Sequence, residues 1–236
     1  MINQPKNTRR LFIGFNLPDS DLEICEEVLK NLKDRGIYNI TKLANIHITL
    51  CFLGNVKSEL LIEIIQKFDN QKFELDNLKF EFNNFQVKYS TKRAMLWATY
   101  FSNKQLDFLH EITHQTFGVN PDHKFSPHVT FCRSRVDKTI LNIHDFEGLK
   151  LSSFSPRQLC LFETKATKKG VQYELLSTQK LDSLFFSISK PQNILPLEAC
   201  MTVEEIFLKV YHFDQWLLFG FHSRLKILCN KARPWC

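Results

Sequence analysis

One short pattern that occurs twice constrains this chain more than any other feature of its sequence. His47-Ile48-Thr49-Leu50-Cys51 is echoed further along by His128-Val129-Thr130-Phe131-Cys132. Alternate side chains of a β-strand share one face, so the histidine and threonine of each copy point one way and the apolar residues point into the core. Each copy therefore predicts a strand that presents an imidazole and a hydroxyl on its open face.

The elements that precede each copy repeat as well. A strand over 10–16 precedes the first copy, followed by a helix from about Ser20, where Ser20 and Glu23 have the spacing of a capping box. A strand over 93–101 and a helix over 103–117 precede the second copy. The repeat predicts two similar lobes that face each other across a cleft, with one His-Thr pair from each lobe.

The rest of the first 182 residues alternates between the two periodicities. We expect a helix and five further strands, the last two linked by a turn at Lys168-Lys169-Gly170: a helix over 58–68 and strands over 46–53, 78–89, 128–132, 158–163 and 171–176. Interleaved helices and strands predict an α+β protein rather than a bundle or a sandwich.

A domain boundary is expected near Asp182. Residues 1–182 form the first domain, and 183–236 form an appendage that begins with a Ser-, Pro- and Asn-rich linker. Thr202 and Glu205 form another capping box, which predicts one or two helices in the appendage. Its apolar end has three possible roles: docking on the first domain, lying on a membrane surface, or binding a partner.

Composition adds weaker constraints. The formal charge of +6 favours anionic partners such as phosphate-bearing substrates. Seven cysteines include no C-x-x-C pair, so neither a zinc ribbon nor a redox motif is expected. The sequence predicts a cytoplasmic protein with free thiols, because it shows no signal-peptide pattern and no apolar run of the ~18 residues that a membrane span requires. A monomer is the default.

The paired motifs favour catalysis on a phosphodiester. Two histidines of near-neutral pKa can act as general base and general acid at one pH, and the hydroxyls of Thr49 and Thr130 can donate to phosphate oxygens. Arg133 could hold a phosphate oxygen or stack on a base. A regular strand would place it opposite Thr130, so its contribution requires a bulge or a strand end; the alternative is a solvent-exposed arginine.

Other chemistry-bearing residues have ordinary interpretations. His110 and His114 have the spacing of two metal ligands on a helix, but without an H-E-x-x-H pattern a plain helix surface is favoured. Period-two counting places Cys51 and Cys132 on the same face as the histidines, as small side chains that line the cleft. No metal site is expected.

Residues 9–181 resemble the two-histidine phosphoesterase superfamily, and within it the RNA 2′,3′-cyclic phosphodiesterases, also called 2′-5′ RNA ligases. The resemblance rests on four stretches of sequence: Arg10-Leu11-Phe12-Ile13-Gly14-Phe15, the first motif with its following Phe52-Leu53-Gly54, Ser126-Pro127 before the second motif with Arg133 after it, and Gly170-Val171-Gln172-Tyr173-Glu174-Leu175.

The resemblance implies a bilobal, pseudo-symmetric α+β fold in which two antiparallel sheets flank a central cleft and the helices lie outside. It implies hydrolysis of 2′,3′-cyclic phosphate RNA ends to 2′-phosphates without metal or cofactor, with His47 as proton donor and His128 as proton acceptor. Thr49, Thr130 and Arg133 would bind substrate. The reverse reaction would join tRNA fragments through a 2′-5′ bond. The alternatives are an RNA-binding module without turnover and a 2′,5′-oligonucleotide phosphodiesterase.

Overall fold

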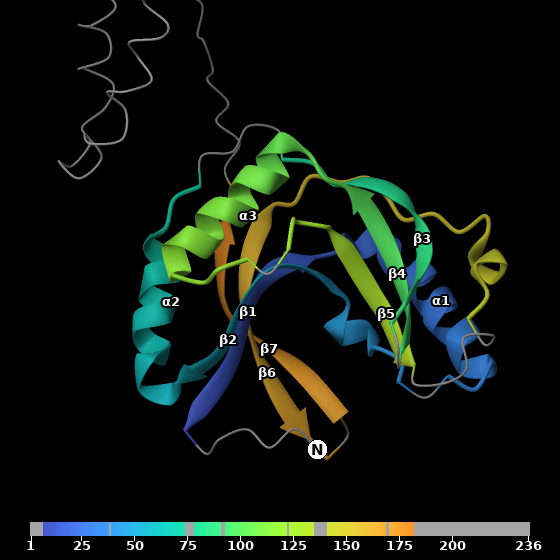
Figure 1. Ribbon diagram of the computed structural model, residues 1–236, viewed down its shortest axis with the longest axis horizontal. Helices are drawn as coiled ribbons and strands as arrows, with labels where there is room; N and C mark the ends of the chain where they lie inside the picture. The colour runs from blue at the N-terminus through green and yellow to red at the C-terminus, as the bar shows by residue number, and fades with distance from the viewer. Residues whose placement is uncertain are drawn as a thin grey trace, which may run out of the picture. The chain divides into compact units, whose positions relative to one another are not determined.

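The computed structural model describes residues 7–181, apart from 38, 74–77, 91–92, 122, 135–140 and 169 (Figure 1). The expected appendage over 183–236, with its linker and helix, lies outside the described residues. Within the described part, no helix is both long enough and apolar enough to cross a membrane.

Seven strands of the described chain form one sheet in the order β3-β4-β5-β2-β1-β6-β7, with every pair of neighbours antiparallel. Their bounds are β1 (Thr8–Asn16), β2 (His47–Lys57), β3 (Glu81–Tyr89), β4 (Ala94–Phe101), β5 (His128–Ser134), β6 (Gln158–Thr167) and β7 (Gly170–Lys180). The α+β class is confirmed. The strands make one continuous sheet rather than the two expected, because β2 and β5 pair through Ile48 and Val129 and so join the two halves.

The helices are α1 (Leu22–Asp34), α2 (Leu61–Asn70) and α3 (Lys104–Phe117). The capping box expected at Ser20 is wrong. Ser20 lies in a 3-10 turn, η1 (Asp19–Asp21), and Asp21 instead accepts hydrogen bonds from the Ser152 amide at 2.9 and 3.1 Å. In α3, by contrast, the Asn103 side chain caps the first turn, and Gly118 ends the helix in the left-handed region at φ 65°.

The predicted repeat is visible in the topology. Exchanging β1 with β4 and β2 with β5 reverses the central strand order and leaves it otherwise unchanged, and a helix follows the first strand of each pair. Each of these two helices covers the other half of the sheet: α1 follows β1 but packs against β5, and α3 follows β4 but packs against β2 (Figure 1). The two halves are therefore tied by crossed helices as well as by the sheet.

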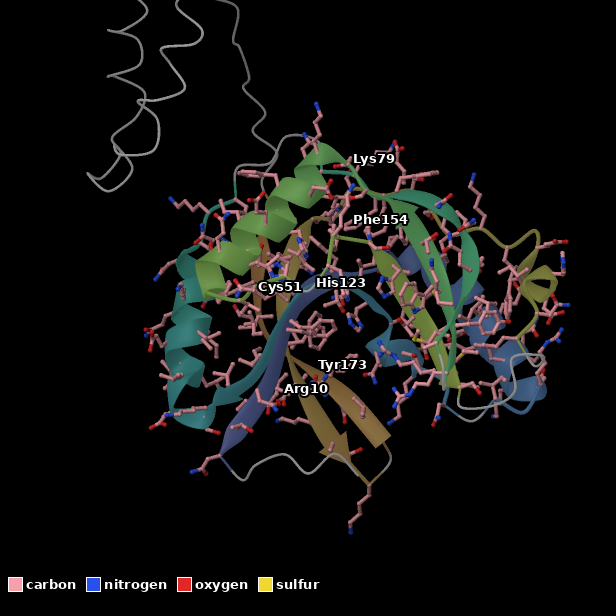
Figure 2. The ribbon with its side chains drawn as sticks, viewed as in Figure 1. Arg10, Cys51, Lys79, His123, Phe154 and Tyr173 are labelled. Carbon is pink, nitrogen blue, oxygen red and sulfur yellow. The ribbon has the colours of Figure 1, made fainter. Side chains whose placement is uncertain are left out.

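The apolar residues divide between two faces of the sheet. The main core lies beneath the helices and includes Ile48, Val129 and both residues that follow the threonines, Leu50 and Phe131. A smaller cluster of Phe12, Cys160 and Phe162, with Tyr173 against it, lies apart from that core. Figure 2 shows Tyr173 in the space between the two halves of the sheet and Cys51 on the side of α3. We call the face that carries His47 and His128 the site face.

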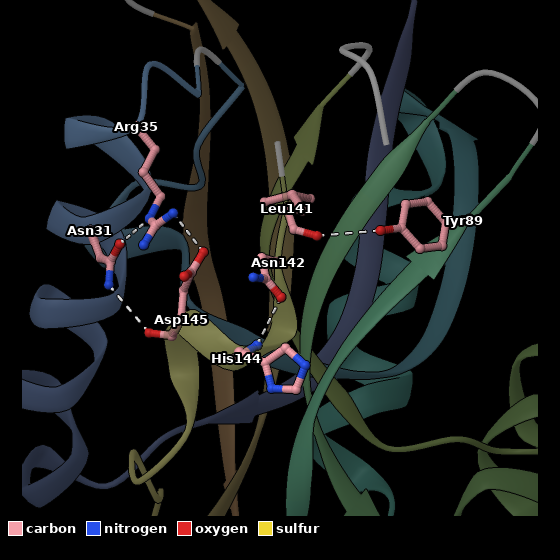
Figure 3. Close-up of polar contacts among 7 residues, drawn as sticks. All are labelled: Asn31, Arg35, Tyr89, Leu141, Asn142, His144 and Asp145. Atoms are coloured by element: carbon pink, nitrogen blue, oxygen red, sulfur yellow. Dashed lines mark hydrogen bonds and ion pairs between the residues drawn. The ribbon is translucent and has the colours of Figure 1, made fainter. Parts of the chain in front are cut away.

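The connection between β5 and β6 is fastened on both sides (Figure 3). Arg35, directly after α1, forms a 2.6 Å ion pair with Asp145 and donates to Asn31 at 2.7 Å, and Asn31 also donates to the Asp145 carbonyl at 3.4 Å. On the other side, the Tyr89 hydroxyl of β3 donates to the Leu141 carbonyl at 3.3 Å. The chain that follows the second motif is thus held between α1 and β3.

Candidate active site

The two histidines begin two adjacent strands. His47 is the first residue of β2 and His128 is the first residue of β5. Because the strands are antiparallel and Ile48 is registered with Val129, His47 lies beside Thr130 and Thr49 lies beside His128 across the junction. The structure thus brings the two His-Thr pairs, far apart in the sequence, together on one face of the sheet.

The main chain fixes which ring nitrogen of His47 carries a proton. Its Nδ1 lies 2.7 Å from the Asn45 carbonyl oxygen, which can only accept, so Nδ1 is the donor. In the neutral ring, Nε2 then has the lone pair and accepts from the Thr49 hydroxyl at 2.9 Å. The nitrogen available for proton transfer is Nε2, paired with its own motif's threonine.

His128 uses the same device. Its Nδ1 donates to the Ser126 carbonyl oxygen at 2.7 Å, again two residues earlier in the chain, so Nε2 again has the lone pair. The ring stacks on Trp97 with centroids 3.8 Å apart and 21° between the planes. The Lys88 ammonium lies 5.8 Å from the Trp97 ring centroid. His128 is therefore oriented by a carbonyl and by an indole that packs against its face.

An aromatic wall surrounds His47 instead. Phe12 and Tyr173 lie 4.8 and 4.9 Å from its ring, measured between centroids, and Phe162 lies 6.3 Å away. Two of these side chains, Phe162 and Tyr173, come from the β6–β7 hairpin, far along the chain from the first motif. The two imidazoles therefore share a hydrogen-bonding pattern and differ in what packs against them.

Burial and positive charge lower the pKa of both rings. Burial lowers the pKa of His47 to about 4, against the opposing effect of the Asn45 bond, and the charges of Arg133 and His128 lower it further. Burial also lowers the pKa of His128, against the Ser126 bond, with further lowering by Arg133 and Lys88. Because Arg133 affects both rings, its guanidinium lies within electrostatic reach of both.

A bulge turns Arg133 onto the site face. Trp97 pairs with Thr130 and Leu96 pairs with Cys132, so Phe131 is an extra residue in β5. The alternation of faces shifts by one after it, and exposed Arg133 falls on the same side as Thr130. The condition that the sequence set for a role of Arg133 in the site is met.

The same bulge occurs in β2. Gly14 pairs with Thr49 and Ile13 pairs with Cys51, so Leu50 is the extra residue. Phe52, which is 55% exposed, therefore occupies in the first half the place that Arg133 takes in the second. The two halves share a backbone device and differ in the side chain that it presents.

The two bulges overturn the expectation for the motif cysteines. Cys51 and Cys132 are 1% and 0% exposed and lie in the core rather than on the site face. Burial raises the pKa of the Cys51 thiol to about 12 and also raises that of Cys132. Period-two counting failed here because one extra residue per strand reverses the face that follows it.

The remaining histidine pair is part of α3. His114 is 7% exposed, and its Nδ1 donates to the His110 carbonyl oxygen at 2.8 Å, while the His110 ring stacks on Phe125. Among the described residues, no three His, Cys, Asp or Glu side chains gather in the manner of a metal site. His110 and His114 are packing residues of the helix, although His114 is buried rather than on the surface.

Three residues of the site were missed in the sequence. Trp97, Asn45 and Tyr173 contact the histidines or their supporting carbonyls, but none lies within a motif repeat. Trp97 could have been found by its place on the strand that precedes the second motif. Tyr173 lies in one of the four stretches that carry the resemblance, but no role was drawn from it. Asn45 had no signal, because its contact with Tyr173 depends on how the hairpin folds back.

The comparisons with known proteins agree with this geometry. Residues 18–97, which include His47 and Thr49, match the family model described as LigT like Phosphoesterase. Relatives from Methanocaldococcus jannaschii and Aquifex aeolicus, both named RNA 2′,3′-cyclic phosphodiesterase, are 24% and 25% identical over 176 and 177 residues. Each alignment covers 71% of this chain, and 98% and 94% of the respective relatives.

A solved structure shows the same fold. The crystal structure of E. coli LigT in its apo form superposes with a TM-score of 0.58 at 16% identity, covering 75% of this chain and 99% of that chain. About a quarter of this chain therefore lies outside the matched region.

Proposed function

The chain belongs to the two-histidine phosphoesterase family, and we propose that it is a metal-independent RNA 2′,3′-cyclic phosphodiesterase in which His47 and His128 exchange protons with the substrate. The observation that carries the proposal is the arrangement of two imidazoles on one face, each with Nδ1 bound to a main-chain carbonyl and Nε2 left for transfer. Acid–base catalysis requires two such groups on opposite sides of one phosphorus atom.

The proposed reaction opens the ring by in-line attack. His128 Nε2 removes a proton from water as the water oxygen bonds to phosphorus. The bond between phosphorus and the 3′ oxygen breaks, and His47 Nε2 protonates that oxygen. The products are a 2′-phosphate and a 3′-hydroxyl, and solvent exchange restores both histidines. The Nδ1 bond to Ser126 supports the acceptor role, because it leaves His128 Nε2 with its lone pair.

Three side chains would hold the phosphate. Thr49 and Thr130 lie beside the two histidines and can donate to the non-bridging oxygens, where negative charge builds up. Arg133 can form two parallel hydrogen bonds to these oxygens. Its exposure on the site face supports this role, since the guanidinium is open to an incoming anion.

The apolar side of the site supports a nucleotide substrate over a free phosphate. Phe52 is 55% exposed on the site face and lies 6.1 Å from Phe12, measured between ring centroids. Leu175 of β7, which is 49% exposed, pairs with Phe162 of β6. A nucleobase can stack on such a surface whatever its sequence, and stacking is how single-stranded RNA ends are commonly held.

Substrate binding would also let His47 take up from solvent the proton that it must donate. With a pKa of about 4, His47 is neutral in the empty site near pH 7. An anionic phosphate raises the pKa of both rings by its own charge and by pairing with Arg133, whose charge otherwise lowers them. In the empty site the pKa values of both rings are lowered, so the direction of proton transfer has its own test below.

The test of the function is hydrolysis in EDTA. Nucleoside 2′,3′-cyclic phosphates and a short RNA with a cyclic phosphate end are incubated with the protein, and phosphorus NMR assigns the position of the product phosphate. Wild type is expected to release 2′-phosphate, and His47→Ala and His128→Ala are expected to lose at least a hundredfold in rate. His144→Ala, at an exposed histidine, is the matched control. RNA binding without turnover would identify a binding module, and cleavage of 2′,5′-linked oligonucleotides alone would identify the other phosphodiesterase.

The roles of the two histidines are separated by the leaving group. In a phosphodiester with a p-nitrophenyl ester, the leaving oxygen departs as an anion and needs no proton. His47→Ala should therefore be rescued on this substrate relative to the cyclic phosphate, whereas His128→Ala should stay slow on both. The reverse pattern would assign His128 as donor and His47 as acceptor.

A further inference from the structure

The tip of the β6–β7 hairpin is fastened to the segment that enters β2. Asn45, 6% exposed in the short turn η2 (Leu43–Asn45), donates from Nδ2 to the Val171 carbonyl at 2.9 Å and accepts at Oδ1 from the Tyr173 amide at 3.1 Å. β7 is the last strand of the sheet, so the Asn45 carboxamide takes the place that a neighbouring strand's peptide group would have. Both polar groups of the side chain are satisfied.

The same residue also binds His47 through its main chain. The Asn45 carbonyl oxygen accepts the 2.7 Å bond from His47 Nδ1, and the Tyr173 ring lies edge-on to the His47 ring at 4.9 Å. One asparagine thus connects to the hairpin by its side chain and to the imidazole by its backbone. Tyr173 contacts both residues, because its amide donates to the Asn45 side chain and its ring packs against His47.

We propose that Asn45 is a positioning residue, which fixes its own carbonyl and Tyr173 so that His47 is held with the proton on Nδ1 and with Nε2 directed at the substrate. The peptide group that carries this carbonyl is held at one end by its own amide, because the Ile46 N–H donates to the Leu43 carbonyl at 3.0 Å. Two side-chain hydrogen bonds to β7 add a second restraint on the Asn45 residue, as outer hydrogen-bond partners do for histidines that bind metals. Its consequence for turnover rests on the proposed phosphodiesterase function.

The second half of the site provides an internal comparison. Ser126 supplies the equivalent carbonyl to His128, but it is exposed, and across the described part of the chain its side chain makes no hydrogen bond. His128 is held by stacking on Trp97 instead. Removing the side chain at 126 should therefore leave His128 unchanged, while removing it at 45 should affect His47.

Asn45 is uncharged, which keeps the test clean. Within the described part of the chain, the titratable or charged groups near the His47 ring are Tyr173, His128 and Arg133, and Asn45→Ala alters none of them chemically. A change in the His47 tautomer in this variant therefore reports orientation rather than added charge. Asn45→Asp has the same shape and keeps the acceptor for the Tyr173 amide, so it serves as the second variant if Asn45→Ala does not fold. It adds a negative charge, and the pKa of His47 measured in the same spectra separates the effect of that charge from the loss of the bond to Val171.

The experiment is long-range ¹H–¹⁵N NMR on full-length protein with ¹⁵N-labelled histidines, recorded on wild type, Asn45→Ala, Asn45→Asp and Ser126→Ala. Wild type should show the proton on Nδ1 in both site histidines. Asn45→Ala should lower the ratio of Nδ1–H to Nε2–H in His47 at least tenfold, with an intermediate effect in Asn45→Asp. His128 should not change in any variant. On the cyclic phosphate, kcat of Asn45→Ala should fall about tenfold or more with KM little changed.

A folded Asn45→Ala variant with a wild-type His47 tautomer would overturn the proposal, even if its melting temperature fell, because Asn45 would then only fasten the hairpin. The NMR result does not depend on turnover. If wild type hydrolyses no cyclic phosphate but the tautomer shifts as expected, the proposed function fails and the positioning role of Asn45 stands.

Discussion

The depressed pKa of His47 predicts that this fold loses stability in mild acid. The unfolded chain takes up a proton on this residue as the pH falls below its ordinary pKa of 6.5, whereas the folded protein takes it up only near 4. Between these values the unfolded state binds more protons, so the free energy of unfolding falls as the pH falls. The sign is the opposite of that for a histidine stabilised by a carboxylate.

The size of the effect follows from the two pKa values. Each tenfold difference in proton affinity corresponds to about 1.4 kcal/mol, so the gap between 6.5 and about 4 amounts to about 3 kcal/mol in full. At pH 4.5 most of it, about 2.5 kcal/mol, is already lost. That is a large part of the stability of a typical domain.

Urea unfolding of wild type and His47→Gln at pH 7.5 and pH 4.5 measures this contribution. Glutamine does not titrate and can still donate to the Asn45 carbonyl, so the variant should lose about 2.5 kcal/mol less between the two pH values. His123→Gln, at an exposed histidine, controls for the loss of an imidazole. Equal losses in wild type and His47→Gln, within about 0.5 kcal/mol, would refute the claim that His47 is buried in its neutral form.

Three further predictions concern the surroundings of the two rings. Arg133→Ala should raise the pKa of both His47 and His128 in an NMR titration, since the arginine lowers both; unchanged pKa values would place the guanidinium elsewhere. Arg133→Lys should keep the pKa values but raise KM, because lysine cannot donate two parallel hydrogen bonds to the phosphate. Inorganic phosphate should raise the pKa of His47 and His128 together, whereas bound phosphate without such a rise would mean that it sits away from the rings. Gly14→Ala should cost about 1–3 kcal/mol in a denaturant titration, because a Cβ there would lie 2.5 Å from the Ile48 carbonyl oxygen between the two motif residues His47 and Thr49; wild-type stability would show that β1 can move aside.

The sequence was a good guide to the parts of the site that depend on local repetition. The two motifs, their preceding strands and helices, and the shared face of His47 and His128 follow from periodicity. The bulges did not follow from it, since an extra residue is defined only by the ladder with the neighbouring strand. That is why the faces of Cys51 and Cys132 were predicted wrongly, and why the placement of Arg133 could be stated only as a condition.

Contacts between segments that lie far apart in the sequence could not be predicted from it. Asn45 and Tyr173 are more than a hundred residues apart, and nothing in either neighbourhood indicates that one amide binds the other. The predicted capping box at Ser20 failed for a related reason: Asp21 is engaged by Ser152, and this distant bond replaces a local cap. Local signals were overridden at points where separate segments meet.

Two properties of the site are set by different parts of the structure: the Nδ1 hydrogen bond of each imidazole and the distance between the two rings. Each imidazole takes its Nδ1 acceptor from two residues earlier in its own segment, so this hydrogen bond does not depend on the pairing of β2 with β5. The span between the rings is set elsewhere, by the Ile48–Val129 pair and by the segment Asn39–Thr41, which pairs with β5 beyond it. Substitutions in Asn39–Thr41 can therefore tune how wide a phosphate ester fits between the rings while each ring remains ready to transfer its proton.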